Sequence, residues 1–166
     1  MVKKYSIINS IIFTLSIFVL VLIDFFTKKF AIENIVADYP STFIPGIIDF
    51  QYLENRGMAW GFLQNQTILL LILSIIVSLI LLFFMYTHSN DIMLCISSVL
   101  IIAGGIGNSI DRISQGYVVD FIRFHFWQSF PIFNFADICV TIGGFLLVLY
   151  VIFKKDQEEV TEINNN

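Results

Sequence analysis

The sequence contains few residues that commonly form disulfides or bind metals. Among its 166 residues are two cysteines, Cys95 and Cys139, and two histidines, His88 and His125. Both cysteines lie within apolar runs, outside any CxxC or Cys/His cluster, so we expect neither a disulfide framework nor a zinc site. The HExxH motif is absent, which disfavours a zinc protease. The chain also lacks a GxSxG nucleophile elbow, a Rossmann fingerprint and a P-loop.

Charged residues are also scarce. They make up 13% of the chain, whereas 57% of the residues are hydrophobic. Soluble domains are nearer about one half apolar and one quarter charged. The apolar excess is gathered into blocks, which indicates a membrane protein. The net charge is −4 and no basic stripe is present, so we expect no nucleic-acid partner.

Four apolar blocks are long enough to cross a bilayer, which takes about 20 helical residues. They cover approximately residues 5–23, 67–86, 92–110 and 135–153. The first block is longer than the apolar part of a signal peptide, and no A-x-A cleavage site follows it. We therefore predict an all-α membrane protein with four transmembrane helices. Residues 1–155 would form a single domain, and residues 156–166 a polar cytoplasmic tail.

The two long connections, residues 24–66 and 111–134, lie on the same side of the membrane if all four blocks span it. The first contains the alternating run Ile48-Asp49-Phe50-Gln51-Tyr52, which predicts a strand with one apolar face. A bare count of basic residues on the two sides does not decide the orientation, but those that flank the first and last spans favour a cytoplasmic location for both termini. These residues are Lys3, Lys4, Lys154 and Lys155. Both connections are then extracytoplasmic.

Polar side chains gather at the span ends that face these connections. A charge at the bilayer centre costs about 2.5–3.5 kcal/mol on insertion scales, so polar residues near the spans are candidates for function. They are Asp24, Lys28, Asn55, Asn108, Asp111, Arg112, Asp120, Asn134 and Asp137. The predicted topology places all of them on one side of the membrane.

Two groups of these residues have helical spacing. Asp24 and Lys28 are four residues apart, so they share a helix face. The alternative for them is a simple ion pair at a helix end. Asn108, Asp111 and Arg112 are spaced i, i+3 and i+4 and also share a face if the third helix continues. The alternative for them is a capped helix end.

Two carboxyl groups stand in apolar sequence. Asp120 lies in YVVDFIRF, where apolar surroundings raise a carboxyl pKa and an extended backbone would point Arg123 to the opposite face. Asp137 begins the last apolar run, where it suits either a helix N-cap or a chemical role. If the two carboxyls meet, they share a proton, and one can act as a base on water while the other acts as an acid. Their separation in sequence leaves the distance between them open.

Five polar stretches stand in order between the predicted spans. They are DFFTK (24–28), NRGMAWG (55–61), GNSIDR (107–112), GYVVDF (116–121) and FNFAD (133–137). In this order they resemble the motifs of the lipoprotein signal peptidases, the type II signal peptidases of bacteria. Each motif alone is loose, but the five together between four spans are specific. Met58 and Trp60 are bulkier than the residues that the family usually has in the second motif.

The resemblance implies an aspartic endopeptidase of the bacterial cytoplasmic membrane, with both termini in the cytoplasm and the active site at the outer face. Its family substrate is a prolipoprotein that carries diacylglyceryl on the lipobox cysteine, and the cut falls just before that cysteine. Family members need no metal or organic cofactor, work among membrane lipids, and are blocked by cyclic peptides such as globomycin. Residues 44–54 would belong to the small extracytoplasmic β-sheet of the family, and a monomer would suffice.

The resemblance also implies roles for particular residues. The catalytic dyad maps to Asp120 and Asp137, with Asp111 as the rival for the first position. We prefer Asp120, because Arg112 and Lys28 would hold Asp111 ionised and a dyad must retain one proton. Substrate-binding or supporting roles fall to Asp24, Lys28, Asn55, Gly57, Asn108, Asp111, Arg112 and Asn134.

A small proton- or ion-coupled membrane transporter is the alternative function. Polar residues inside a membrane also mark ion pathways. However, a transporter should carry such residues near the middle of the membrane, and the middles of the second and fourth apolar blocks contain no charge. This distribution favours the peptidase.

Overall fold

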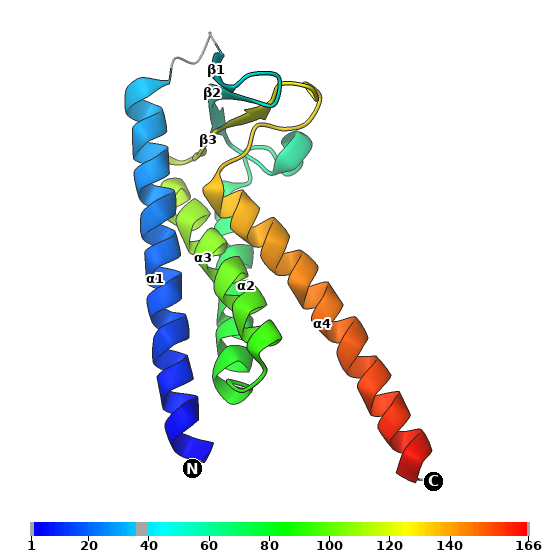
Figure 1. The fold of residues 1–166 in the computed structure, drawn as a ribbon. Helices are drawn as coiled ribbons and strands as arrows, with labels where there is room; N and C mark the ends of the chain where they lie inside the picture. The colour runs from blue at the N-terminus through cyan, green and yellow to red at the C-terminus, as the bar shows by residue number, and fades with distance from the viewer. Residues whose placement is uncertain (1, 36–39, 166) are drawn as a thin grey trace.

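A computed structural model describes residues 2–35 and 40–165, with side chains described for residues 7–35 and 40–154. Four long helices carry a three-stranded sheet at one end, called here the sheet end (Figure 1). The helices are α1 (Val2–Asn34), α2 (Thr67–Thr87), α3 (Ile92–Gln115) and α4 (Phe135–Asn165). The strands are β1 (Ser41–Ile44), β2 (Ile48–Asn55) and β3 (Val118–Phe124), and η1 (Ala59–Gly61) is a short 3-10 helix. All four long helices contain a stretch apolar enough to cross a membrane, which confirms the predicted fold class.

Three helices are longer than the predicted spans. α1 continues to Asn34 instead of ending near Ile23, because Asp24 and Lys28 form an ion pair within the helix that satisfies both charges. α3 continues to Gln115 and ends where Gly116 adopts a left-handed conformation, with φ of 82°. α4 runs through the predicted tail as far as Asn165. The residues that follow the first and third spans are therefore helical and do not belong to the connections.

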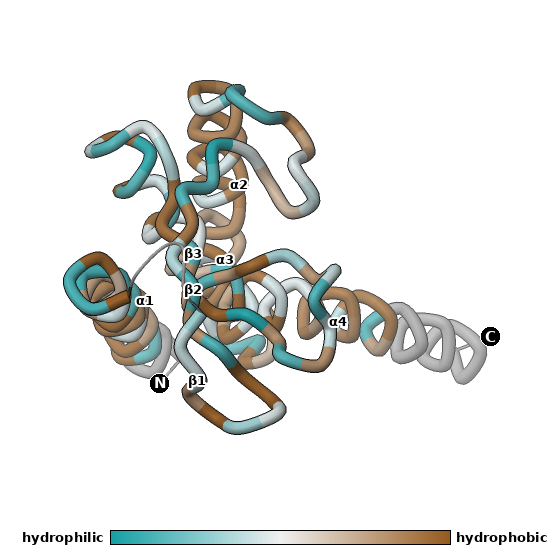
Figure 2. Tube along the Cα trace, turned by 90° about the horizontal axis from the view of Figure 1, so that it is seen from above, coloured by the Kyte–Doolittle hydropathy of each residue, from teal (hydrophilic) through white to brown (hydrophobic). Residues whose placement is uncertain are grey.

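α3 is the central helix and packs against the other three (Figure 1). In its most apolar stretch 56% of the residues are buried in the protein, against at most 17% in the other helices. Seen from the sheet end, α1, α2 and α4 surround α3, and their traces are mostly apolar (Figure 2). The outward faces of these three helices therefore suit a lipid environment.

Glycines in α3 let α4 approach closely. A Cβ atom on Gly104 would clash with the backbone oxygen of Ala136 and lie 2.7 Å from a methyl group of Val140. A Cβ atom on Gly107 would clash with the carboxylate of Asp24. The start of α4 is thus held directly against α3, beside the buried end of α1.

The sheet has the order β1-β2-β3 and is antiparallel throughout. β2 confirms the strand predicted from the alternating run and extends it to Asn55. β3 is extended, and a bulge in the pairing of β2 with β3 places Leu53 opposite Asp120. Val119 and Phe121 of β3 pack with Ala31 of α1, which fixes the sheet on the helix end.

The first turns of α1 and the last turns of α4 lie at the end opposite the sheet (Figure 1). Lys3, Lys4 and Lys155, on which the predicted orientation partly rests, fall outside the residues whose side chains the structure describes. The assignment of the cytoplasmic side therefore stays a prediction.

We predict that Gly104→Ala destabilises the fold. The added methyl group has no room against Ala136, and overpacking of this kind costs about 1–3 kcal/mol. Denaturant titration in detergent micelles measures the free energy of unfolding. Gly144→Ala is the matched control, because a Cβ atom at Gly144 meets nothing within 4 Å and the helix gains up to about 1 kcal/mol in propensity. Equal stability of the two variants would refute the close contact of α3 with α4.

Candidate active site

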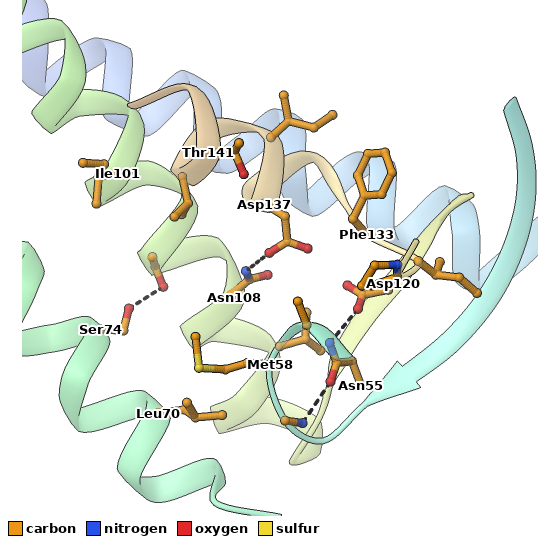
Figure 3. A pocket seen from close by; sticks show the side chains of 18 of the residues that line it. Asn55, Met58, Leu70, Ser74, Ile101, Asn108, Asp120, Phe133, Asp137 and Thr141 are labelled. Carbon is orange, nitrogen blue, oxygen red and sulfur yellow. Dashed lines mark hydrogen bonds between the residues drawn. The ribbon is translucent and has the colours of Figure 1, made fainter. Parts of the chain in front are cut away.

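Polar side chains from five elements meet at the sheet end. Asp24 comes from α1, Asn55 from β2, Asn108 from α3, Asp120 from β3 and Asp137 from α4. A cavity of about 800 Å³ opens beside them, and its wall includes Asn55, Asn108, Asp120 and Asp137 (Figure 3). The rest of its wall is mainly apolar and comes from α2, α3, α4, β3, the loop after β2 and the loop before α4. The cavity thus joins a polar end to an apolar groove between the helices.

Asp120 is fully buried and is held by two amides. Its Oδ1 accepts a hydrogen bond from Asn134 Nδ2 at 2.7 Å, and its Oδ2 accepts one from Asn55 Nδ2 at 2.8 Å. As expected for an extended strand, Arg123 is turned elsewhere and donates to Gln51 Oε1 at 3.0 Å. Burial, followed by the nearby charge of Asp137, raises the pKa of Asp120 to about 7. This carboxyl group can therefore hold or release a proton near neutral pH.

Asn134, and not Asp137, is the N-cap of α4. Its Oδ1 accepts a hydrogen bond from the Asp137 backbone N–H at 2.9 Å, and Asp137 Oδ2 accepts one from the Asn134 backbone N–H at 3.2 Å. These reciprocal bonds form a capping box, in which Asp137 occupies the third helical position. The other oxygen of Asp137 accepts a hydrogen bond from Asn108 Nδ2 at 2.8 Å. The N-cap alternative for Asp137 therefore does not hold, although its carboxylate does stabilise the helix start.

The side chain of Asn134 links the Asp120 carboxyl group to the backbone of Asp137. Its amide nitrogen contacts Asp120 Oδ1, the Val119 carbonyl oxygen at 3.3 Å and Asn108 Oδ1 at 3.1 Å, while its oxygen accepts a hydrogen bond from the Asp137 backbone N–H. Asp120 and Asp137 consequently face the same cavity from β3 and α4 (Figure 3). The charge of Asp137 is close enough to raise the pKa of Asp120.

A buried ammonium group lies behind the cavity wall. Lys28 is only 3% exposed, and its Nζ lies 2.8 Å from Asp24 Oδ2 and 3.0 Å from Asp111 Oδ2. Asp24 Oδ1 in turn accepts a hydrogen bond from the Ala136 backbone N–H at 2.9 Å, in the first turn of α4. Asp111 Oδ2 also accepts one from the Val119 backbone N–H at 3.1 Å. This single cluster joins α1, α3, α4 and β3.

Lys28 also fixes the orientation of Asn108. Lys28 Nζ donates to Asn108 Oδ1 at 2.9 Å, on the oxygen that Asn134 Nδ2 also contacts. With both donors on the oxygen, the amide nitrogen of Asn108 is left to face Asp137. A side chain of α1 thereby orients a hydrogen bond to the carboxylate in the cavity.

The loop after β2 forms one side of the cavity. Arg112 Nη2 donates to the Gly57 carbonyl oxygen at 3.1 Å, and the Gly57 backbone N–H donates to Asn55 Oδ1 at 2.9 Å. Next to them, Met58 lines the cavity and the ring of Trp60 stacks edge-on against Phe130 at 5.7 Å. Trp60 has a φ of 55°, a left-handed conformation that is unusual for a bulky residue. The two bulky residues of this motif therefore border the cavity directly.

The family model described as signal peptidase (SPase) II matches residues 16–153. The chain belongs to the signal peptidase II family. A lipoprotein signal peptidase of Clostridium tetani is 38% identical over 142 residues, which cover 84% of this chain and 91% of that relative. One of Streptococcus thermophilus is 39% identical, covering 85% of this chain and 92% of the relative.

A solved bacterial membrane enzyme, determined by the in meso method, has a similar fold. It is 29% identical, covers 87% of this chain and 90% of its own, and has a TM-score of 0.81. The family resemblance and the fold class predicted from the sequence are thus confirmed. As a signal peptidase II with four spans, the chain is a multi-pass membrane protein and a protease of the aspartic class.

The structure gathers all the residues that the sequence singles out, but in two groups. Those that line the cavity are Asn55, Gly57, Asn108, Arg112, Asp120 and Asp137, and those behind its wall are Asp24, Lys28, Asp111 and Asn134. Sequence reasoning missed the apolar wall on α2, which includes Leu70, Leu73, Ser74 and Val77. Their i, i+3, i+4, i+7 spacing is the signal that could have identified one face of this helix.

We predict that Lys28→Met destabilises the fold by about 3–5 kcal/mol, because it leaves the buried carboxylates of Asp24 and Asp111 without their cation. Lys29→Met is the matched control. Its side chain is 59% exposed, and its ion pair with Glu33, at 3.9 Å, should contribute at most about 1 kcal/mol.

Thermal and denaturant unfolding in detergent micelles checks both variants. Adding Asp24→Asn and Asp111→Asn to Lys28→Met should recover part of the lost stability, because no buried charge then lacks a partner. A Lys28→Met variant as stable as Lys29→Met would show that the buried cluster contributes nothing to the fold.

Proposed function

We propose that this signal peptidase II removes the signal peptide from diacylglyceryl-modified prolipoproteins by cutting just before the lipidated cysteine. One observation carries the proposal: Asp120 and Asp137 line a single cavity whose wall is otherwise mainly apolar and extends between membrane-spanning helices. Carboxyl groups in that setting can catalyse hydrolysis of a peptide bond, while the apolar walls of the groove hold the lipid and the signal peptide.

In the proposed mechanism, one carboxylate of the pair takes a proton from a water molecule, which attacks the carbonyl carbon before the cysteine. The other carboxyl group carries the shared proton and gives it to the nitrogen of the cysteine, so the C–N bond breaks. The pair finishes with one proton, as it began. The pKa of Asp120, about 7, suits it to carry that proton at neutral pH.

The geometry supports Asp120 over Asp111 as the partner of Asp137. Asp111 contacts Lys28 and the Val119 backbone N–H, and it does not line the cavity in the described part of the chain. Asp120 has two neutral amides as partners and lines the cavity with Asp137. Arg112, Asn55 and Asn108 also line it, where their donors can contact the scissile peptide.

The substrate would enter from the lipid phase. Acyl chains and the apolar signal peptide would lie along the groove that α2, α3 and α4 form, and cyclic peptides of the globomycin type would compete for the same space. We place both termini in the cytoplasm of a bacterium and the sheet end at the outer face of its cytoplasmic membrane. A monomer would be sufficient, because one chain supplies every residue of the site.

A transporter is less consistent with this arrangement. Among the described residues, the buried charged side chains all lie at the sheet end, and they are Asp24, Lys28, Asp49, Asp111 and Asp120. In the described residues, the groove wall that α2 adds to the cavity carries no charged side chain. An ion pathway would need polar groups that continue toward the opposite end.

We predict that Asp120→Asn and Asp137→Asn each reduce the cleavage rate by at least about 10²–10⁴-fold, because each removes an acid–base group. Asp91→Asn is the control with the same chemical change, at the opposite end of α3 from the cavity. Purified enzyme in detergent and a lipidated prolipoprotein, with products separated by mass, provide the measurement. Full cleavage by either dyad variant would disprove the assignment.

We further predict that kcat/KM falls as the pH rises through about 7, because the pair then loses the proton that it must donate. Asn55→Ala removes a hydrogen bond that favours ionised Asp120, so the pKa of Asp120 rises and the fall moves to higher pH.

Gln51→Ala is the matched control for this shift. Gln51 is a side chain of the same strand that bonds Arg123 and not the dyad, so its loss should leave the profile in place. The measurement is the pH dependence of kcat/KM for the unmodified enzyme, Asn55→Ala and Gln51→Ala. An Asn55→Ala profile that falls at the same pH as the unmodified enzyme would contradict the role of Asp120.

A further inference from the structure

A second, smaller cavity adjoins the first on the other side of the loop after β2. It has a volume of about 320 Å³ and is called here the outer pocket. The polar part of its wall consists of Glu54, Asn55, Arg56, Gln64 and Ser129. Both cavities share a partition formed by Met58, Ala59 and Trp60 of the loop and by Pro131 and Ile132. A substrate peptide that crosses this partition passes from one cavity directly into the other.

Asn55 marks the border between the two cavities. It lines both of them, and its amide nitrogen holds Asp120 at 2.8 Å. Leu53, two residues earlier, also lines the outer pocket and lies opposite Asp120 in the sheet. The outer pocket therefore begins one side chain away from the candidate catalytic carboxyl group.

The outer pocket differs chemically from the first cavity. Arg56 and Glu54 lie 3.1 Å apart with side chains 52% and 43% exposed, and Arg56 also stands over the ring of Tyr117 at 5.5 Å. The two charges balance, while Gln64 and Ser129 add neutral hydrogen-bonding groups. Together with the apolar partition, these polar groups suit an extended peptide of mixed polarity better than an acyl chain, which would leave the polar groups without partners.

This inference rests on the proposed function, which requires the substrate to have three parts at the cut. The signal peptide and the acyl chains are apolar and match the groove. The third part, the mature polypeptide after the cysteine, belongs to a protein that leaves the membrane, so it must run out at the sheet end. We infer that the outer pocket binds the first residues after the lipidated cysteine, in extended form, with Glu54 and Arg56 contacting their side chains.

Charge reversal in the outer pocket tests this inference. Two lipidated precursors are used that differ only in carrying Lys or Asp at the two residues after the cysteine. Arg56→Glu should raise the ratio of kcat/KM for the Lys precursor over the Asp precursor by about two- to fivefold, and Glu54→Lys should lower it by a similar factor. Both shifts should shrink at high salt, because the contacts are exposed.

The pair Lys29 and Glu33 provides matched controls. These side chains form an exposed ion pair at the same end of the molecule, on α1, and do not line the outer pocket. Lys29→Glu and Glu33→Lys introduce the same changes of charge, so they should leave the ratio unchanged. A ratio that moves equally in the controls, or stays constant in the pocket variants, would overturn the inference.

A cross-linking experiment gives an independent readout that does not depend on turnover. A precursor with benzoylphenylalanine at the second residue after the cysteine is irradiated with the Asp137→Asn enzyme. Adducts are expected in the segments that contain Gln64 and Ser129, and adducts confined to α2 or α4 would contradict the subsite.

The cleavage assay separates the subsite from the proposed function. Failure of the unmodified enzyme to cut either the Lys or the Asp precursor would contradict the proposed function, whereas normal cleavage with unchanged kcat/KM ratios in the pocket variants would contradict the subsite alone.

Discussion

The buried ammonium group of Lys28 is the interaction on which the rest of the site depends. Charged groups that are buried in a membrane protein, away from water and lipid head groups, need partners within the protein. Lys28 has such partners in Asp24 and Asp111, and Asp24 in turn holds the first turn of α4. The same ammonium orients Asn108 toward Asp137. One buried cation therefore sets both the packing of three helices and the hydrogen bonds of the cavity.

Structural and chemical roles coincide in the first turn of α4. Asn134 caps the helix, and Asp137 completes the capping box, while both side chains also contact the network around Asp120. A helix that must begin at this point thus brings a carboxylate to the cavity without additional structure. The short sheet does the same for Asp120, because the extended β3 turns Arg123 away from it. The two carboxyl groups line the same cavity, and their side-chain partners are amides and not cations.

Much of this arrangement could be predicted from local patterns, and some could not. The apolar blocks predict the four spans, and the alternating run predicts the β2 strand. The gathering of polar residues at one end follows because four spans place both long connections on the same side of the membrane. The pairing of Lys28 with Asn108 could not be predicted, because it joins residues 80 positions apart and depends on how α1 packs on α3. The spacing of Asp24 and Lys28 indicates a helical turn, but the continuation of α1 to Asn34 could not be predicted, because two further partners of Lys28, Asp111 and Asn108, lie on α3. Asn134 and Asp137 are both good capping residues, so only the backbone geometry distinguishes the cap from its partner.

The central claim is that Asp120 belongs to a carboxyl pair that holds one proton near neutral pH. Infrared difference titration of the protonated-carboxyl C=O band, on the unmodified enzyme and on Asp120→Asn, tests it most directly. We predict a band in the unmodified enzyme that disappears as the pH rises through about 7 and that Asp120→Asn abolishes or shifts. A band that is absent below that pH, or that the substitution leaves unchanged, would contradict the shared proton and the mechanism built on it.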